Sequence, residues 1–208
     1  MITSFIKQYI LPKEIDFIAS MQEHALIIDS IVNDLYECFI AKKPLNCTKL
    51  LESENQARST REKNMSELLN SFITPIDRES IYRVIFQLDW IAVSIRHFML
   101  EANAYEANDP HITYQELMIN IKEQSRLLCN GFSNLKKDSP MVASCAQGVR
   151  DGYEKIFEIY IRKMAELSKS NDLREIFVER ELLAQLREIG KRFQICANSL
   201  EDIVVKMN

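Results

Sequence analysis

The sequence predicts an all-α protein made of six long antiparallel helices, and two observations lead to that prediction. First, residues that make tight turns are scarce: the 208 residues include 4 glycines and 5 prolines, whereas the two types make up roughly 12% of an average soluble protein. Sheets and phosphate-binding loops use glycine at their turns. Second, proline fits the first turn of a helix and disrupts its interior, so evenly spaced prolines indicate helix starts. They stand at positions 12, 44, 75, 110 and 140.

The composition indicates a folded chain of one domain or two small ones. Hydrophobic residues make up 47% of the chain and charged residues 27%, enough apolar surface for a sizeable core. The 26 Lys and Arg against 30 Asp and Glu give a net charge of −4, which argues against a nucleic-acid partner because phosphate binding normally needs a basic face. No apolar run approaches the ~18 residues of a membrane span, and residues 1–13 lack the apolar core of a signal peptide. We expect a cytoplasmic protein with no membrane insertion.

The first three helices are predicted after the first three prolines. After Pro12 and Pro75, apolar residues recur every three or four positions and share one face of a helix. The helix after Pro44 has a polar middle, in which only Ala57 can join a core. Thr74-Pro75-Ile76-Asp77 has the order of a capping residue, a first-turn proline and an acid. The apolar faces comprise Ile18, Met21, Ala25, Ile28, Val32, Leu35 and Phe39 in the first helix, and Ile81, Val84, Leu88, Ile91, Ile95 and Phe98 in the third.

The fourth and fifth helices follow Asp109-Pro110 and Ser139-Pro140, where a capping residue precedes proline. The sixth has no proline, and Asp172 is its expected cap. Helices of this length would each be ~40 Å long and joined by short loops, as in antiparallel bundles. A seam near residues 105–112 divides the chain into halves of similar length, 12–105 and 110–207, but no residue repeat links them.

Catalytic and metal-binding patterns are lacking. None of the three histidines has the Glu three residues earlier that di-iron bundles use, and no phosphate loop, G-x-S-x-G or H-E-x-x-H occurs. The five cysteines are widely spread with no C-x-x-C pair, so we expect buried, reduced thiols. The polar stretch 52–64 allows two interpretations. It is a solvated face in which Glu54 pairs with Arg58, or it places Glu54 opposite Asp89 of the next helix so that two carboxylates converge on a cation.

Two strings resemble a known family. Residues 71–82, which read SFITPIDRESIY, with Leu88-Asp89 after them, resemble the divergent PhoU-like family of proposed phosphate transport regulators, and residues 197–206, ANSLEDIVVK, are similar to its closing helix. The resemblance implies six helices in a pair of three-helix bundles, no enzymatic activity, and an accessory or regulatory role in phosphate uptake, often beside a Pit-type transporter. It also implies metal clusters held through E/D-x-x-x-D motifs on four helices.

Most of the carboxylates of those metal motifs are missing from this chain. Counting from the two strings, the four motifs fall on Glu54 and Arg58, Asp89 and Val93, Val149 and Tyr153, and Lys191 and Ile195. Each missing carboxylate removes a ligand and its charge. We therefore expect no cofactor and a largely degenerate metal site, of which Glu54 and Asp89 remain. A shift of one residue in the fifth helix would bring Asp151 and Glu154 near the site.

The sequence thus predicts a non-enzymatic regulatory or accessory protein of inorganic phosphate transport. We expect it in the cytoplasm, peripheral to the inner membrane through contact with a phosphate transporter or another protein. Two alternatives stay open: a storage or redox bundle that binds a divalent or ferric ion through Glu54, Asp89, Asp151 and Glu154, and a helical scaffold or chaperone unrelated to phosphate. The sequence does not predict the partner, the sign of regulation or the oligomeric state. A homo-oligomer stays open. We also expect Trp90 to be buried.

Overall fold

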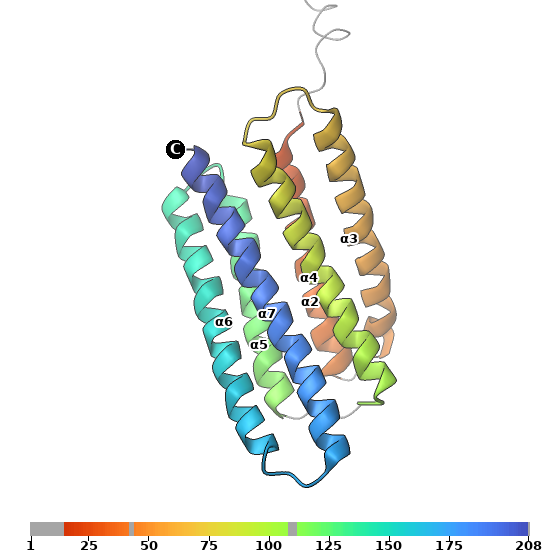
Figure 1. The fold of residues 1–208 in the computed structure, drawn as a ribbon. Coiled ribbons are helices and arrows are strands. Elements are labelled where there is room, and N and C mark those ends of the chain that lie inside the picture. Colours follow the sequence, from red (N-terminus) through yellow and green to blue (C-terminus); the bar gives the residue numbers. More distant parts are fainter. Residues whose placement is uncertain (1–14, 42–43, 108–111, 208) are drawn as a thin grey trace, which may run out of the picture.

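The computed structural model describes residues 15–41, 44–107 and 112–207, and within them it contains six helices and no strand. The helices are α2 (Phe17–Phe39), α3 (Pro44–Asn70), α4 (Arg78–Ala104), α5 (Ile112–Asn134), α6 (Ser139–Leu167) and α7 (Leu173–Met207). They run up and down along one axis and form a single elongated bundle (Figure 1). The predicted all-α fold of six antiparallel helices is confirmed. Pro12, Asp109 and Pro110 lie outside the described residues.

The core is shared by both halves of the chain. α2, α3 and α4 pack against one another, as do α5, α6 and α7, and the two sets meet where α4 contacts α7 and α2 contacts α5. Among the described helices, α3 contacts only α2 and α4, and α6 contacts only α5 and α7. Four helices therefore surround the central core while α3 and α6 cover it on opposite sides (Figure 1).

The predicted apolar faces are the buried faces. From Ile81 to Phe98 all six predicted core residues of α4 are buried. One side of α7 is buried in the same way, by Leu182, Leu186, Ile189, Phe193, Cys196, Leu200 and Ile203. Ala57 is buried in α3 as expected, but Asn64 is buried as well. The polar middle of α3 therefore contributes a side-chain amide to the interior, which the apolar pattern could not show.

Aspartates cap the helices. Asp172 accepts hydrogen bonds from the backbone N–H groups of Arg174 and Glu175, as predicted. Two other predicted caps are wrong: Asp77, not Thr74, caps α4 by accepting from Ser80 N–H, and Asp138, not Ser139, caps α6. A carboxylate also stabilises the positive end of the helix dipole, which a hydroxyl does not.

A buried glutamine joins the three helices of the second half. Gln124 of α5 donates through Nε2 to the carbonyl of Val149 in α6 at 2.9 Å and to that of Gly190 in α7 at 3.2 Å. Glycine makes room for it, since a Cβ added at Gly152 would lie 2.8 Å from Gln124 Cγ, and one at Gly190 would lie 3.3 Å from Gln124 Oε1. Two of the chain's 4 glycines therefore serve close packing around one polar side chain.

Two sequence predictions about single residue types are wrong. Cys38 takes part in a disulfide bond, whereas Cys129, Cys145 and Cys196 are free thiols as expected. Trp90 is 43% exposed, not buried. Its indole lies on the outward side of α4, and the Arg192 guanidinium of α7 lies 5.1 Å from the ring centroid.

Candidate functional site

The two predicted ligand residues, Glu54 and Asp89, lie on neighbouring helices but each faces an arginine. Asp89 Oδ2 of α4 is 3.0 Å from the Arg61 guanidinium of α3, and Asp89 is only 7% exposed. Glu54 Oε1 of α3 is 3.7 Å from the Arg96 guanidinium of α4. The pairs alternate in direction, because α3 supplies the acid of one pair and the base of the other.

The spacing of these pairs shows that the two carboxylates do not converge. Glu54 lies seven residues before Arg61 and Asp89 lies seven before Arg96. Seven residues correspond to about 10 Å along a helix axis at 1.5 Å per residue. The interpretation that placed Glu54 opposite Asp89 is therefore wrong by two helical turns. The other interpretation is also wrong in its detail, since Arg58 is exposed and pairs with Glu62, at 3.3 Å.

Burial sets the electrostatics around Asp89. Loss of hydration raises the pKa of Asp89, and the Arg61 guanidinium opposes that rise. A buried carboxylate that keeps its charge needs such a partner. Asp89 and Arg61 therefore form a neutral pair that offers a cation little free negative charge.

His24 of α2 lies in the same part of the core and has no role predicted from the sequence. It is fully buried, and burial, with a smaller contribution from the charge of Arg61, lowers its pKa to about 4. Neither its ring nitrogens nor Asn64 Nδ2 has a hydrogen-bond partner among the described residues. The hydrogen bond from Ser53 of α3 to Asp34 of α2 reports the register of these two antiparallel helices, and in that register His24 lies level with Asn64. His24 is thus neutral at pH 7.

The corresponding positions of the second half lie elsewhere. Val149 is buried, whereas Lys191, Asp151 and Glu154 are exposed. Since α6 has no contact with α3 or α4, Asp151 and Glu154 cannot join Glu54 and Asp89 in one site. Within residues 15–41, 44–107 and 112–207, no group of three or more His, Cys, Asp or Glu side chains could hold a metal ion.

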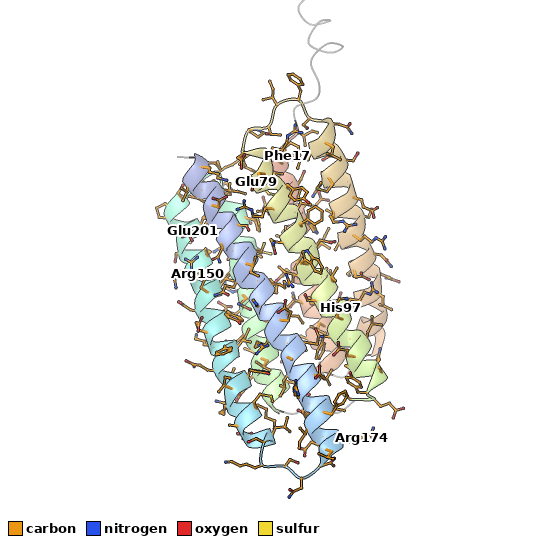
Figure 2. The ribbon with its side chains drawn as sticks, in the orientation of Figure 1. Phe17, Glu79, His97, Arg150, Arg174 and Glu201 are labelled. Carbon is orange, nitrogen blue, oxygen red and sulfur yellow. The ribbon has the colours of Figure 1, made fainter. Side chains whose placement is uncertain are left out.

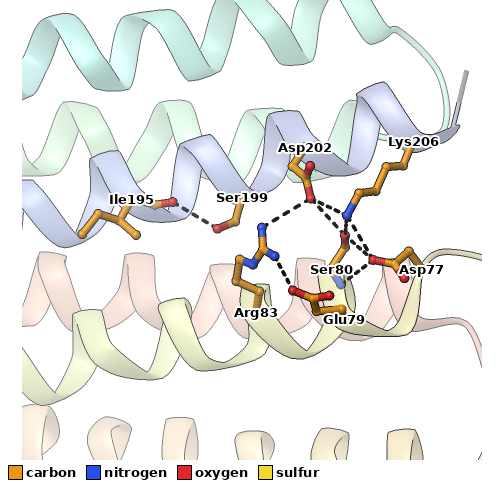
Figure 3. Close-up of polar contacts among 8 residues, drawn as sticks. All are labelled: Asp77, Glu79, Ser80, Arg83, Ile195, Ser199, Asp202 and Lys206. Carbon is orange, nitrogen blue, oxygen red and sulfur yellow. Dashed lines mark hydrogen bonds and ion pairs between the residues drawn. The ribbon is translucent and has the colours of Figure 1, made fainter.

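The two strings that carry the family resemblance meet at one end of the bundle. Ser80, from the first string, donates to Asp202 of the second at 3.0 Å, and Lys206 Nζ lies 3.1 Å from Asp77 Oδ2 and 2.9 Å from Asp202 Oδ2 (Figure 3). Arg83 adds a second cation, 3.6 Å from Asp202. The hydrogen bonds from Ser80 and Lys206 lower the pKa of Asp77 to about 2. These ion pairs join the start of α4 to the end of α7.

A second ion pair fastens α6 to α7 near the same end. The Arg150 guanidinium lies 2.8 Å from Glu201 Oε2 (Figure 2). Two adjacent residues of the second string therefore contact different helices: Glu201 contacts α6, and Asp202 contacts α4. Sequence reasoning found the strings but not their contact, because a match to a family does not show which segments meet in space.

Comparison with known proteins identifies the fold. No family model matches the sequence. A crystal structure of a PhoU-like protein from Shewanella oneidensis MR-1 superposes with a TM-score of 0.73 at 14% identity, covering 90% of this chain and 99% of that one. This chain has the PhoU-like fold. A second S. oneidensis structure, described as a candidate PhoU-like phosphate regulatory protein, superposes with a TM-score of 0.69 at 14% identity and covers 91% and 99% of the two chains.

The resemblance to PhoU-like proteins predicted from residues 71–82 and 197–206 is therefore confirmed by the fold. The PhoU-like chain is also 27% identical over 195 residues to UPF0111 protein YkaA of Bacillus subtilis (strain 168), covering 84% of this chain and 90% of that protein. That name states no activity. Among the described helices, none is long and apolar enough to cross a bilayer.

Proposed function

We propose that this PhoU-like chain regulates inorganic phosphate transport by binding a transporter on the cytoplasmic side of the inner membrane, without catalysing a reaction. The observation that supports the proposal is the PhoU-like fold over 91% of the chain, shared with an S. oneidensis protein described as a candidate phosphate regulator. Function in such a fold resides in particular surfaces and sites. The choice of protein contact over metal chemistry therefore rests on the residues of this chain.

The ion pairs of Arg61 with Asp89 and of Arg96 with Glu54 favour a function based on protein contact over one based on metal binding. Arg61 and Arg96 neutralise the two carboxylates that remain at the metal-motif positions. A divalent ion at Asp89 would have to displace a guanidinium from a nearly buried acid and would meet that positive charge at close range. The proposal therefore includes a degenerate metal site, in which ion pairs hold α3 against α4.

The loop between α3 and α4 offers contact residues. Phe72 and Ile73, in the first family-like string, are 91% and 82% exposed at one end of the bundle. Large apolar side chains that project into solvent from a loop are typical of interaction sites. We include these two side chains in the proposed transporter contact.

The test is capture of the tagged chain from detergent-solubilised membranes of its native host, with identification of co-purifying proteins by mass spectrometry. We expect a phosphate permease with the unaltered chain and its loss with the Phe72→Ser, Ile73→Ser double variant. The matched control is Leu173→Ser with Phe177→Ser, which removes exposed apolar side chains at the other end of the bundle. Capture of no phosphate transporter by the unaltered chain would count against the proposal.

A further inference from the structure

The outward side of α4 is apolar along most of its length. Tyr82, Phe86, Trp90, Val93, His97 and Leu100 follow one another at intervals of three or four residues and therefore share one side of the helix. It lies opposite the buried side that runs from Ile81 to Phe98. Tyr82, Trp90, His97 and Leu100 are exposed, and Phe86 and Val93 are partly exposed. We call these six residues the α4 face; α3 and α7 flank it (Figure 1), and His97 marks its lower part (Figure 2).

The composition of the α4 face is that of a protein interface. The solvent side of a surface helix is ordinarily charged and polar. Here three aromatic rings lie in a row, with the Tyr82 and Phe86 rings in contact at a centroid distance of 4.5 Å and tilted by 40° to each other. Arg83, Arg96 and Arg192 border the row, and lysine is absent from the six positions. Tyr, Trp, Phe and Arg are the residues enriched at the energetically important centre of interfaces.

We propose that the α4 face binds the α4 face of a second copy of this chain, antiparallel and around a two-fold axis. The sizes of the side chains support a second copy as the occupant. The large aromatic residues fill the first half of the face, and the smaller Val93, His97 and Leu100 fill the second. An antiparallel pairing centred between Trp90 and Val93 places each large side chain against a smaller one, the arrangement that lets facing layers interdigitate.

The register of this pairing follows from the spacing alone. Tyr82 lies level with Leu100 of the second copy, Phe86 with His97, and Trp90 with Val93. A two-fold axis makes each of these contacts twice, so one helix pair buries six large side chains. The interval pattern matches that of helices that pack with their axes at a small angle.

Charge at the α3 border agrees with the same register. In the antiparallel pair, Arg96 lies level with Gln87 of the second copy. Glu62 follows Arg61, which contacts Asp89, so Glu62 of the second copy lies near that level on the same side. Both side chains are accessible, with 43% of Arg96 and 59% of Glu62 exposed, although within one chain Arg96 already contacts Glu54 and Glu62 already contacts Arg58 and Arg61. The pairing thus brings opposite charges together at each end of the apolar row, and such attraction contributes more to specificity than to affinity.

The test measures the mass of the full chain in solution and the fluorescence of Trp90, its only tryptophan. Over roughly a 1000-fold range of protein concentration, which covers three decades of Kd, we expect a mass near twice 24.3 kDa at the upper end. Dilution should halve the mass and shift Trp90 emission to longer wavelength, because the indole leaves an interface for water.

Two variants make the test specific to this surface. Leu100→Glu places a charge in the α4 face, and we expect it to remain monomeric at all concentrations. The control is Leu26→Glu on α2, where the replaced leucine is 54% exposed against 51% for Leu100, and it should dimerise like the unaltered chain. Circular dichroism of both variants checks that they keep their helices. A monomeric unaltered chain at the highest concentration, or a dimer that Leu100→Glu leaves intact, would overturn the proposal.

Discussion

Arg61 and Asp89 join α3 to α4 through an ion pair of 3.0 Å at the edge of the core. The pair occupies a position where resemblance to the PhoU-like family implied a metal ligand. The pair of Glu54 and Arg96 lies two helical turns away. Together the two ion pairs hold the outer helix α3 against α4, which is needed because α3 has few buried apolar residues.

Removing the arginine should destabilise the protein. In Arg61→Ala the Asp89 carboxylate is left buried without its cation, and breaking a buried pair in this way costs about 3 kcal/mol of unfolding free energy. Arg58→Ala is the matched control, since Arg58 is on the same helix, exposed and paired with Glu62, and surface pairs contribute about 0 to 1 kcal/mol. Urea unfolding at pH 7 measures both.

The cost of Arg61→Ala should also depend on pH. Burial raises the pKa of Asp89 in the folded protein, and Arg61 opposes that rise, so the variant raises it further. A carboxyl with a raised folded pKa stabilises the folded state when protonated and loses that contribution as pH rises through the folded pKa. The difference between variant and parent should therefore be largest at pH 7 and shrink towards the ordinary aspartate pKa of about 3.9. An equal difference at both pH values would contradict this explanation.

His24 should make the fold sensitive to mild acid. Its pKa is lowered from 6.5 to about 4 by burial, so its contribution to stability is complete above pH 6.5 and is lost as pH falls through about 4. Integrated over that range, the shift corresponds to about 3 kcal/mol. In His24→Leu this part of the pH dependence should disappear, as measured by urea unfolding at several pH values. Parallel stability curves for the variant and its parent would show that His24 is not responsible.

Gln124 and Gly152 should be coupled. In Gly152→Ala the new Cβ would lie 2.8 Å from Gln124 Cγ, so the glutamine must move and weaken its hydrogen bonds to α6 and α7. We expect a loss of about 1 to 3 kcal/mol, typical of overpacking. In the Gln124→Ala background the same change should be neutral or stabilising, because alanine favours helix by up to ~1 kcal/mol over glycine. A double-mutant cycle with no coupling energy would refute the prediction.

Metal content tests the proposal that ion pairs have replaced a metal site. Elemental analysis of the purified chain should find much less than one transition-metal ion per molecule, because Arg61 and Arg96 already neutralise the carboxylates. Treatment with a chelator should leave the Tm unchanged. A stoichiometric metal whose removal lowers the Tm would favour the storage or redox alternative instead.

The sequence predicted local features well and contacts between helices poorly. Proline and apolar spacing located the helices because both act within one segment: Pro44 begins α3, and Ile81 to Phe98 form the buried side of α4. Whether Glu54 faces Asp89 or Arg96 depends on the register of two helices, which packing over their whole length decides. The exposure of Trp90 was missed for a related reason. Trp90 stands between the buried residues Asp89 and Ile91, but its own side chain lies on the outward side of α4. The sequence of α4 does not show which of its sides the neighbouring helices cover.

The rate of inorganic phosphate uptake in the native host decides whether this PhoU-like chain regulates phosphate transport. Uptake is measured in the parent strain, in a strain lacking the gene, and in that strain with the gene restored, each under phosphate-rich and phosphate-poor conditions. We expect the deletion to change the uptake rate in at least one condition and the restored gene to return it to the parental value. Identical uptake in all three strains under both conditions, together with no transporter captured by the tagged chain, would contradict the proposed function.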